Sequence, residues 1–468
     1  MSEASPALQD GAASAASPHV GGTQPPLLSR NLPLLGHLLE LRKQPIELFA
    51  RVRDECGEIG EMNFAGNRVV LLSGEEAQEA FFRGDEEQLD QAAAYPFMTP
   101  VFGRGVVFDG TPEQRRQAMR NQSLRDKMMR THAETIANET RRMMEKLGDA
   151  GEVDLLDFFS ELTLYTSSAC LIGAEFREEL TPEYFRVFYE LEKGTDPIAY
   201  VNPDLPLPTF RKRDRARARL VELLTEVFER RAARKDGKRE LFDALLQIRN
   251  EDGSHRYTID QVTGMFISMM FAGHHTTSGT AAWTLIELLR NPGVVEKTRA
   301  EVDTLYADGR DVSYQALREI PFLESCIKEA LRLHPPLIIL MRKVMRDFTN
   351  KGWTVPEGKL VAVSPAVSNR DPACFPDPDR FDPARYDEGR EEDRRHIFGW
   401  IPFGAGRHRC VGAAFAMMQL KAIFSDLLLR YDFELAQPPE SYVNDHSKMV
   451  VQLRQPCRAR YRRRETAA

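Results

Sequence analysis

The sequence predicts a mainly α-helical protein with a small β portion, folded as one large domain. Segments with helix-period apolar residues dominate the chain, whereas residues typical of strands gather in a few places. Hydrophobic residues make up 42% and charged residues 28% of the 468 residues, which is typical of a globular protein. Neither a fixed-period repeat nor a long linker interrupts the span between Pro25 and Arg464.

The first 24 residues differ in composition from the rest. They are rich in Ala, Ser and Gly and lack the basic and apolar regions of a secretory signal, so we expect a disordered tail over 1–24 and the single domain over 25–464. No apolar run reaches the 18 or so residues that a membrane span needs. We therefore predict a soluble, cytoplasmic protein.

Charge and cysteine usage exclude several classes of function. There are 63 Lys and Arg residues against 70 Asp and Glu residues, giving a net charge of −7, which disfavours general nucleic-acid binding. The six cysteines lie far apart and none forms a C-x-x-C pair, so a zinc ribbon or thioredoxin-type motif is excluded. A reducing cytosol fits this pattern.

Helical patterns can be placed in chain order. They cover residues 115–145, 215–234, 257–290, 292–306, 321–333 and 412–430. Strand patterns cover residues 68–72, 359–363 and 449–453. Leu337–Met341 has the composition of a buried strand but could also line a pocket with one face.

The helix over 257–290 is unusually long. Thr258 and Gln261 form a capping box, the apolar pattern runs to Leu289, and Asn-Pro-Gly at 291–293 ends it. About 33 residues at 1.5 Å each would span about 50 Å and cross the domain. Its middle, residues 273–279, is polar: it is either a turn facing the surface or a stretch where the helix opens locally to hold water or a ligand. The apolar flanks favour burial, so we predict the opened helix.

The segment FGAGRHRCVG, residues 403–412, is the strongest chemical motif. Its glycines would let the backbone approach something flat and bulky. Cys410 immediately precedes a helix, and Arg407, His408 and Arg409 add positive charge, so a lowered thiol pKa and a thiolate are expected. With no second Cys or His at zinc spacing, a single thiolate indicates axial ligation of haem iron, whose propionates would suit the cationic side chains.

A second motif is weak when taken alone. Glu329 and Arg332 are three residues apart, so they share a helix face, but exposed pairs of this kind are common. Arg385, in the segment FDPARY, is a further arginine shortly before the cysteine region.

Together, these motifs resemble those of the cytochrome P450 superfamily and occur in the same order, over roughly residues 25–464. His408 stands where an arginine is usual and His275 where an acid usually precedes the threonine, and both resemble the sterol 14α-demethylase branch of bacterial soluble type. The segment from Tyr95 to Asp109 resembles that branch's substrate-contacting segment. The resemblance implies the P450 fold: a single large haem-binding domain crossed by one long helix.

The resemblance also implies roles for individual residues. Cys410 would ligate the iron of haem b, with Tyr95, Arg342, His408 and Arg116 as propionate partners; Arg115 is an alternative to Arg116. His275 and Thr276 would deliver protons to bound oxygen, with His275 titrating near neutral pH. Glu329, Arg332 and Arg385 would form a buried structural triad. The apolar substrate wall would comprise Phe97, Met98, Phe102, Phe108, Ala272, Leu337, Ile338, Ile339, Met449 and Val450.

The activity implied is removal of a sterol 14α-methyl group with O2, through an alcohol and an aldehyde to formate. Because the chain has no dinucleotide-binding glycine loop and no iron–sulfur cysteine cluster, electrons from NAD(P)H would come through a ferredoxin reductase and a ferredoxin. Azole inhibitors are expected to bind. Two alternatives remain: a haem-thiolate enzyme acting on another lipid or terpenoid, which segment 95–109 would distinguish, and a non-catalytic haem sensor, which would not need Thr276 in an opened helix.

Overall fold

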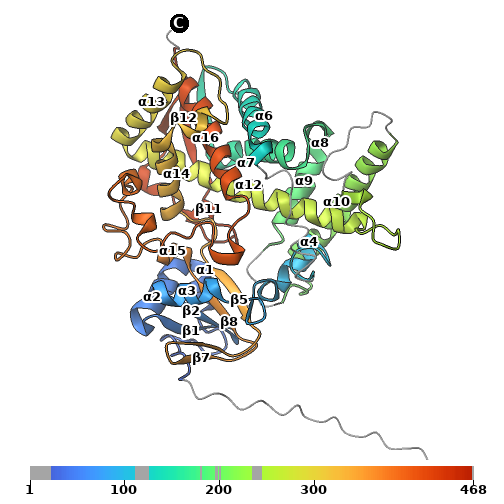
Figure 1. Cartoon of the computed structure of the whole chain (residues 1–468), viewed down its shortest axis with the longest axis vertical. Helices are drawn as coiled ribbons and strands as arrows, with labels where there is room; N and C mark the ends of the chain where they lie inside the picture. Colours follow the sequence, from blue (N-terminus) through green and yellow to red (C-terminus); the bar gives the residue numbers. More distant parts are fainter. Residues whose placement is uncertain are drawn as a thin grey trace, which may run out of the picture.

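The long helix predicted from the sequence crosses the middle of the molecule in the computed structural model (Figure 1). The structure describes residues 23–110, 126–179, 182–195, 199, 202–233 and 245–465. The helix, α12 (Ile259–Arg290), has 32 residues and begins with the predicted capping box: the Thr258 hydroxyl accepts from the Gln261 N–H, and the Gln261 side chain accepts from the Thr258 N–H. Asn291 follows its last residue, as predicted.

The prediction of a local opening in α12 was wrong. The helix is continuous through residues 273–279. The hydroxyls of Thr276, Thr280 and Thr284 donate to the carbonyl oxygens four residues earlier, at 2.7, 2.7 and 2.8 Å. The polar side chains therefore find acceptors on their own helix, and no break is needed to satisfy them. The sequence argument against a non-catalytic haem sensor depended on Thr276 lying in an opened helix. Because the helix is continuous, that argument no longer holds.

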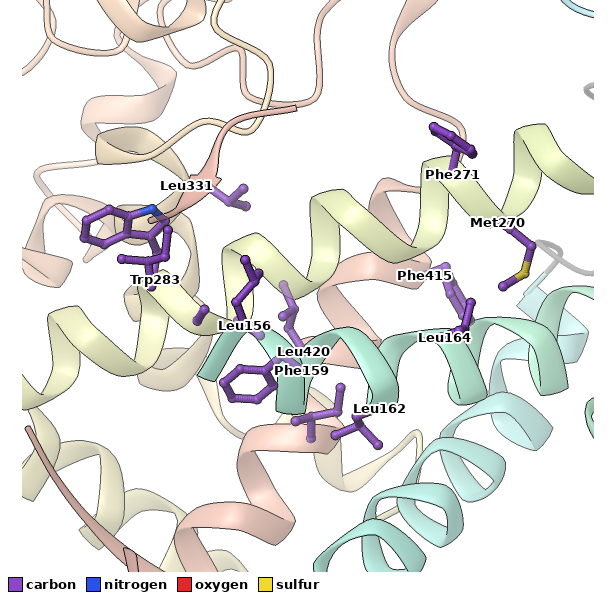
Figure 2. Packing of buried hydrophobic residues seen from close by; sticks show 14 of the residues in the cluster. Leu156, Phe159, Leu162, Leu164, Met270, Phe271, Trp283, Leu331, Phe415 and Leu420 are labelled. Carbon is purple, nitrogen blue, oxygen red and sulfur yellow. The ribbon is translucent and has the colours of Figure 1, made fainter. Parts of the chain in front are cut away.

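Helix α7 (Leu155–Ser167) packs lengthwise against α12, and Figure 2 shows the apolar side chains between and around the two helices. Asp154 caps α7 by accepting from the N–H groups of Leu156 and Asp157. A Cβ at Gly273 would lie 3.0 Å from the Ser167 hydroxyl oxygen, so the helices approach closely here. Phe271 points away from α7 (Figure 2). The face of α12 that carries Phe271 can therefore contact segments other than α7.

The remaining helices surround this pair. They are α1 (Leu38–Lys43), α2 (Pro45–Cys56), α3 (Glu75–Arg83), α4 (Thr99–Phe102), α6 (Asp126–Met144), α8 (Ala174–Glu179), α9 (Pro182–Glu192), α10 (Pro208–Ala232), α13 (Pro292–Tyr306), α14 (Pro321–Leu333), α15 (Pro365–Ser368) and α16 (Ala413–Arg430). Figure 1 shows α6, α13 and α16 toward one end of the molecule and α2 and α3 beside the main sheet toward the other.

The strands form one main sheet and three small ones. They are β1 (Ile59–Phe64), β2 (Asn67–Leu72), β3 (Leu89–Asp90), β4 (Ala150–Asp154), β5 (Leu340–Val344), β6 (Phe348–Asn350), β7 (Trp353–Val355), β8 (Leu360–Val363), β9 (Tyr431–Leu435), β10 (Asn444–Asp445), β11 (Gln452–Leu453) and β12 (Arg458–Arg463). The main sheet has the order β1-β2-β8-β5-β3, with β2 and β8 parallel in the register Val70 to Val361 and the other pairs antiparallel. The small sheets are β4-β12-β9, β10-β11 and β6-β7.

The predicted mainly helical fold with a small β portion is confirmed. The helices over 292–306 and 321–333 match α13 and α14, and most of the helix over 115–145 that lies in the described residues matches α6. The strand over 449–453 is shorter than predicted, since β11 covers Gln452–Leu453, and Leu337–Ile339 precede β5 rather than joining it. Short strand patterns are uncertain because pairing partners distant in sequence decide them.

The N-terminal boundary also differs from the prediction. Residues 1–22 lie outside the described residues, but Thr23 pairs with the hairpin of β6 and β7: its N–H donates to the Gly352 carbonyl, and its own carbonyl accepts from the Thr354 N–H, both at 3.1 Å. Thr23 therefore belongs to the folded part rather than to a tail over 1–24. In the described ranges, no helix combines the length and apolar content needed to cross a membrane.

Candidate functional site

Cys410, an exposed residue, lies in the turn before α16. Its N–H donates to the Phe403 carbonyl at 2.8 Å, which closes the glycine-containing loop. The glycines serve different purposes. A Cβ at Gly406, where φ is +63°, would lie 2.3 Å from the Phe82 carbonyl oxygen, so this glycine lets the loop pack against α3 rather than against a ligand. A Cβ at Gly412 would have only the Cys410 sulfur within 4 Å, so backbone beside the sulfur is open.

The surroundings of the Cys410 thiol have opposing effects on its pKa. Desolvation by neighbouring protein atoms raises the pKa of the Cys410 thiol, while the N–H groups of Gly412 and Ala413 and the charge of Arg409 lower it. The net shift is upward, so the prediction that helix and cations alone lower this pKa was wrong. These donors still stabilise the anionic sulfur, and coordination to a metal deprotonates a thiol outright.

Arg342, in strand β5 of the main sheet, lies next to Tyr95. Tyr95 accepts a hydrogen bond from the Met341 N–H at 2.9 Å, and burial raises its pKa. Arg342 is 2% exposed, and its Nη1 atom has no hydrogen-bond partner in the part of the chain that the structure describes. Burial lowers the pKa of Arg342 to about 10, against the charges of Tyr95, Glu86 and Asp90. A buried guanidinium N–H without a protein acceptor calls for an anionic ligand group.

His408 lies near the same acidic residue as Arg342. Its Nε2 atom is 3.9 Å from the Glu86 carboxylate, and Glu86 also interacts electrostatically with Arg342. The structure thus places Tyr95 and Glu86 near Arg342, and His408 near Glu86. Arg115 and Arg116 lie outside the described residues.

Aromatic side chains contact one another in sequence along the segment predicted to contact substrate, Tyr95 to Asp109; we call them the aromatic chain. The ring centroids of Tyr95 and Phe97, Tyr95 and Phe108, and Phe102 and Phe108 lie 5.5–5.7 Å apart, and Phe102 meets Phe271 of α12 at 5.6 Å. Close backbone contact places this segment on α12, because a Cβ at Gly264 would lie 2.0 Å from the Phe102 carbonyl oxygen. Phe97, Met98 and Phe102 are buried in the main core, and Phe108 is partly buried against it.

The other predicted wall residues come from α12 and two loops. The Val451 N–H donates to the Pro336 carbonyl at 2.8 Å, which brings the loop carrying Met449 and Val450 to the loop of Leu337–Ile339. Gln452 then donates to the His275 carbonyl of α12 at 3.1 Å. Leu337 is 39% exposed and Ala272 is exposed although it lies in the middle of the central helix, so both have apolar surface available for contact.

The structure adds an acidic residue that the sequence did not indicate. The Nε2 atom of His275 contacts the Oε1 atom of Glu192, the last residue of α9. Burial raises the pKa of Glu192 to about 8 and lowers the pKa of His275 to about 3. The prediction that His275 titrates near neutral pH was therefore wrong, and Glu192 is the group that does. Glu192 lies 83 residues before His275, and no local pattern could have paired them.

The Glu329 carboxylate lies between two buried arginines. It is 2.8 Å from Arg332 Nε and 3.0 Å from Arg385 Nε, and all three side chains are at most 1% exposed. The carboxylate also accepts from the Tyr386 hydroxyl and from the Asp382 N–H, each at 2.9 Å. Arg385 additionally pairs with Glu392 at 2.8 Å. The three predicted residues thus meet in a hydrogen-bonded network larger than the triad.

Comparison with known proteins agrees with this geometry. The profile of the family described as cytochrome P450 matches residues 25–459. The chain belongs to the cytochrome P450 family. Members of this family bind haem through a cysteine thiolate, and the exposed residue Cys410 together with the Arg342 N–H that has no partner among the described residues fits such a group.

Comparison with individual relatives identifies the branch of the P450 family. The chain is 58% identical to the sterol 14alpha-demethylase of Mycobacterium tuberculosis over 92% of this chain and 96% of the relative. It is 37% identical to the sterol 14-demethylase of Arabidopsis thaliana over 94% and 92% of the two chains. The structure matches the retinoic acid-bound cyanobacterial CYP120A1 with a TM-score of 0.83 and 22% identity, covering 95% of this chain and all of the other, which shows the shared P450 fold. The predicted sterol 14α-demethylase branch is confirmed.

Proposed function

We propose that this P450 oxidatively removes the 14α-methyl group of a sterol precursor, using O2 and electrons from a redox partner. The observation that carries the proposal is the 58% identity to a mycobacterial sterol 14alpha-demethylase over nearly both full chains. The test is a titration with 14α-methyl sterols, followed by mass analysis of products after turnover with a ferredoxin and its reductase. Demethylated sterol and formate are expected. Turnover of another lipid or terpenoid with no 14α-methyl sterol product would contradict the proposal.

Cys410 is the residue proposed to ligate the haem iron, and Tyr95, Arg342, His408 and Arg116 to hold the propionates. Support comes from the buried Arg342 N–H that lacks an acceptor among the described residues, and from the positions of Tyr95 near Arg342 and of His408 near Glu86, which also acts on Arg342. When bound, haem b supplies the oxidative chemistry, because a cysteine thiolate ligand favours cleavage of the O–O bond. The protein's part is to hold the group, exclude water and supply protons.

The substrate wall proposed for the sterol is apolar and built from three elements. The aromatic chain from Tyr95 to Phe108 contributes Phe97, Met98 and Phe102. Ala272 comes from α12, and the two loops joined by the Val451–Pro336 hydrogen bond contribute Leu337–Ile339 and Met449–Val450. A large, flat, apolar molecule suits such a wall, and a drug-sized azole would use the same surface.

Glu192, His275 and Thr276 are proposed to move protons toward the reacting oxygen. At pH 7 Glu192 is mostly protonated, since burial raises its pKa to about 8, and His275 is neutral. His275 Nε2, which contacts Glu192 Oε1, can accept a hydrogen bond from this carboxyl, and the proton moves to Nε2 only as the Nδ1 proton of His275 passes on to the next acceptor. Thr276 is the next residue along α12, and its hydroxyl, which donates to the Ala272 carbonyl, can accept a hydrogen bond from a water.

Changing the relay should damage turnover while leaving sterol binding nearly intact. We expect Glu192→Gln, His275→Ala and Thr276→Ala to lower the ratio of sterol product to electrons consumed, because positioned acids typically contribute about 10²–10⁴-fold. In the unchanged protein, turnover should fall as pH rises through about 8, where Glu192 loses its proton, and Glu192→Gln should remove that dependence. The measurements are product per electron across pH and the sterol dissociation constant.

Two matched controls accompany these variants. Glu190→Gln changes an exposed acid on α9, and Thr304→Ala removes a helical threonine hydroxyl that donates to the Ala300 carbonyl at 2.6 Å. Neither should alter coupling. Unchanged coupling in all three relay variants would mean that these side chains only pack the helix. Lost sterol binding with intact coupling would instead make His275 part of the substrate wall.

A ferredoxin, reduced through its reductase by NAD(P)H, is the proposed electron donor. Arg407 and Arg409 are exposed next to Cys410 and offer positive charge to an acidic partner. The C-terminal arginines are less suitable for docking, since Arg463 pairs with Asp149 and Arg464 with Asp303, each at 2.8 Å.

A cytoplasmic location is proposed as well. A ferredoxin donor fits this location, and the chain's unpaired cysteines fit a reducing compartment. A single folded domain is proposed too; it runs to Arg464, as predicted, and includes Thr23 at its start.

Electron transfer from an acidic ferredoxin should slow as salt rises. Screening shortens the range of attraction to about 8–10 Å near physiological ionic strength, so long-range steering weakens. Arg407→Gln should lower the reduction rate at low salt and flatten its salt dependence. Arg42→Gln, on α1, is the control and should behave like the unchanged protein. A reduction rate that does not respond to salt would remove the electrostatic docking proposal.

A further inference from the structure

Three side chains that commonly bind metals meet where α9 and α12 pack together. One ring nitrogen each of His274 and His275 and one carboxylate oxygen of Glu192 lie within 4.8 Å of one another. The two imidazole centroids are 4.5 Å apart. The proton relay proposed above uses Glu192 and His275, but it leaves His274 without a role.

The hydrogen bonds around His274 indicate which of its nitrogens is free. The Thr163 hydroxyl donates to the Phe159 carbonyl at 2.8 Å, so its oxygen can accept from His274 Nδ1, 3.0 Å away. Nδ1 then carries the proton, and Nε2 carries a lone pair. His274 is 0% exposed, and its Nε2 atom has no hydrogen-bond partner among the described residues. A buried lone pair of this kind needs a donor or a Lewis acid.

We propose that Glu192, His274 and His275 form a binding site for a divalent transition-metal ion of the zinc class, and that occupancy of this site inhibits the enzyme. Two imidazoles and one carboxylate are a zinc ligand set that leaves a position for water. Ligating histidines usually donate a hydrogen bond from their second ring nitrogen to a neighbouring oxygen, and the Thr163 hydroxyl oxygen, 3.0 Å from His274 Nδ1, can accept one. Magnesium and calcium prefer oxygen ligands and are not expected to bind.

Positive charges near the site limit its affinity for a divalent metal ion. Lys448 lies close enough to act electrostatically on both Glu192 and His275, and Lys193 acts on Glu192. These cations oppose a divalent ion. Access is narrow but present, since the side chains of His275 and Glu192 are 13% and 10% exposed. Lys448→Ala should therefore tighten zinc binding.

Inhibition follows from the atoms that the metal would occupy, and this part rests on the proposed function. A metal held by Glu192 and His275 takes the carboxylate oxygen and ring nitrogen between which the relay proton moves. Bound zinc should lower the ratio of sterol product to electrons consumed and should leave the sterol dissociation constant nearly unchanged.

The test uses the untagged haem-loaded protein and zinc chloride. Equilibrium dialysis with elemental analysis should find one zinc per chain, whereas magnesium chloride should give none. His274→Asn and Glu192→Gln should each weaken zinc binding at least tenfold, and His255→Asn, at an exposed histidine, should not. Because His274 lies outside the relay, His274→Asn should still turn over sterol and should resist inhibition by zinc. Haem content and thermal stability check that each variant is folded.

The possible outcomes distinguish a failure of the metal-site proposal from a failure of the proposed function. No stoichiometric zinc, or zinc binding unchanged in both His274→Asn and Glu192→Gln, would overturn the site. Zinc bound through these residues with unchanged coupling would overturn its inhibitory role. Failure of the zinc-free protein to demethylate any sterol would contradict the proposed function, while the dialysis result would still decide the metal site.

Discussion

Cys410→Ser should abolish the absorption band that the reduced carbon-monoxide complex of a thiolate-ligated haem gives, together with all sterol turnover. A serine hydroxyl is a poor substitute for a thiolate, although it fits the same space and keeps the hydrogen bond from the residue 410 N–H to the Phe403 carbonyl. The loss should be complete rather than graded, because no other described cysteine is exposed. The measurements are the difference spectrum and the haem content of the purified protein.

Cys56→Ser provides the matched control for this experiment. Cys56 is a partly exposed thiol on α2, and its sulfur is only 3.9 Å from the Pro26 carbonyl oxygen, a weak contact. Its replacement should leave spectrum and activity unchanged. A normal carbon-monoxide band in Cys410→Ser would show that another residue is the axial ligand.

Glu329→Ala should prevent accumulation of folded, haem-loaded protein. The carboxylate receives donors from Arg332, Arg385, Tyr386 and the Asp382 N–H, and its removal leaves two buried guanidinium groups with less compensation. Removing one partner of a buried ion pair costs about 3–5 kcal/mol. That cost is a large part of a typical domain stability of about 5–15 kcal/mol. The measurements are soluble yield, haem content and thermal midpoint.

Glu319→Ala is the control, two residues before the same helix. Glu319 pairs with Arg310, and both side chains are exposed, at 42% and 36%, so the pair contributes little to the free energy of unfolding. Its loss should change yield and midpoint little. Equal behaviour of the two variants would show that the buried network around Glu329 does not support the fold.

Local sequence patterns predicted several helices correctly because their signals lie within the helices themselves. Proline begins both α13 and α14, where it lacks only an N–H that would have no partner, and the capping box of α12 is closed by neighbouring residues. The strands β5 and β11 were less predictable. The extent of β5 depends on pairing with β8, for which Arg342 faces Val361, and β11 pairs only with the two residues of β10.

The sequence by itself determined the family, the cysteine and the two arginines that meet Glu329, because these signals are residue types at a recognisable spacing. Only the tertiary structure decided the ionisation of the site. Burial together at the end of α9 and the middle of α12 raises the pKa of Glu192 and lowers that of His275, and desolvation by neighbouring segments outweighs the helix N–H groups at Cys410. A pKa depends on desolvation and on charges a few ångströms away, and these are set by packing between segments distant in sequence.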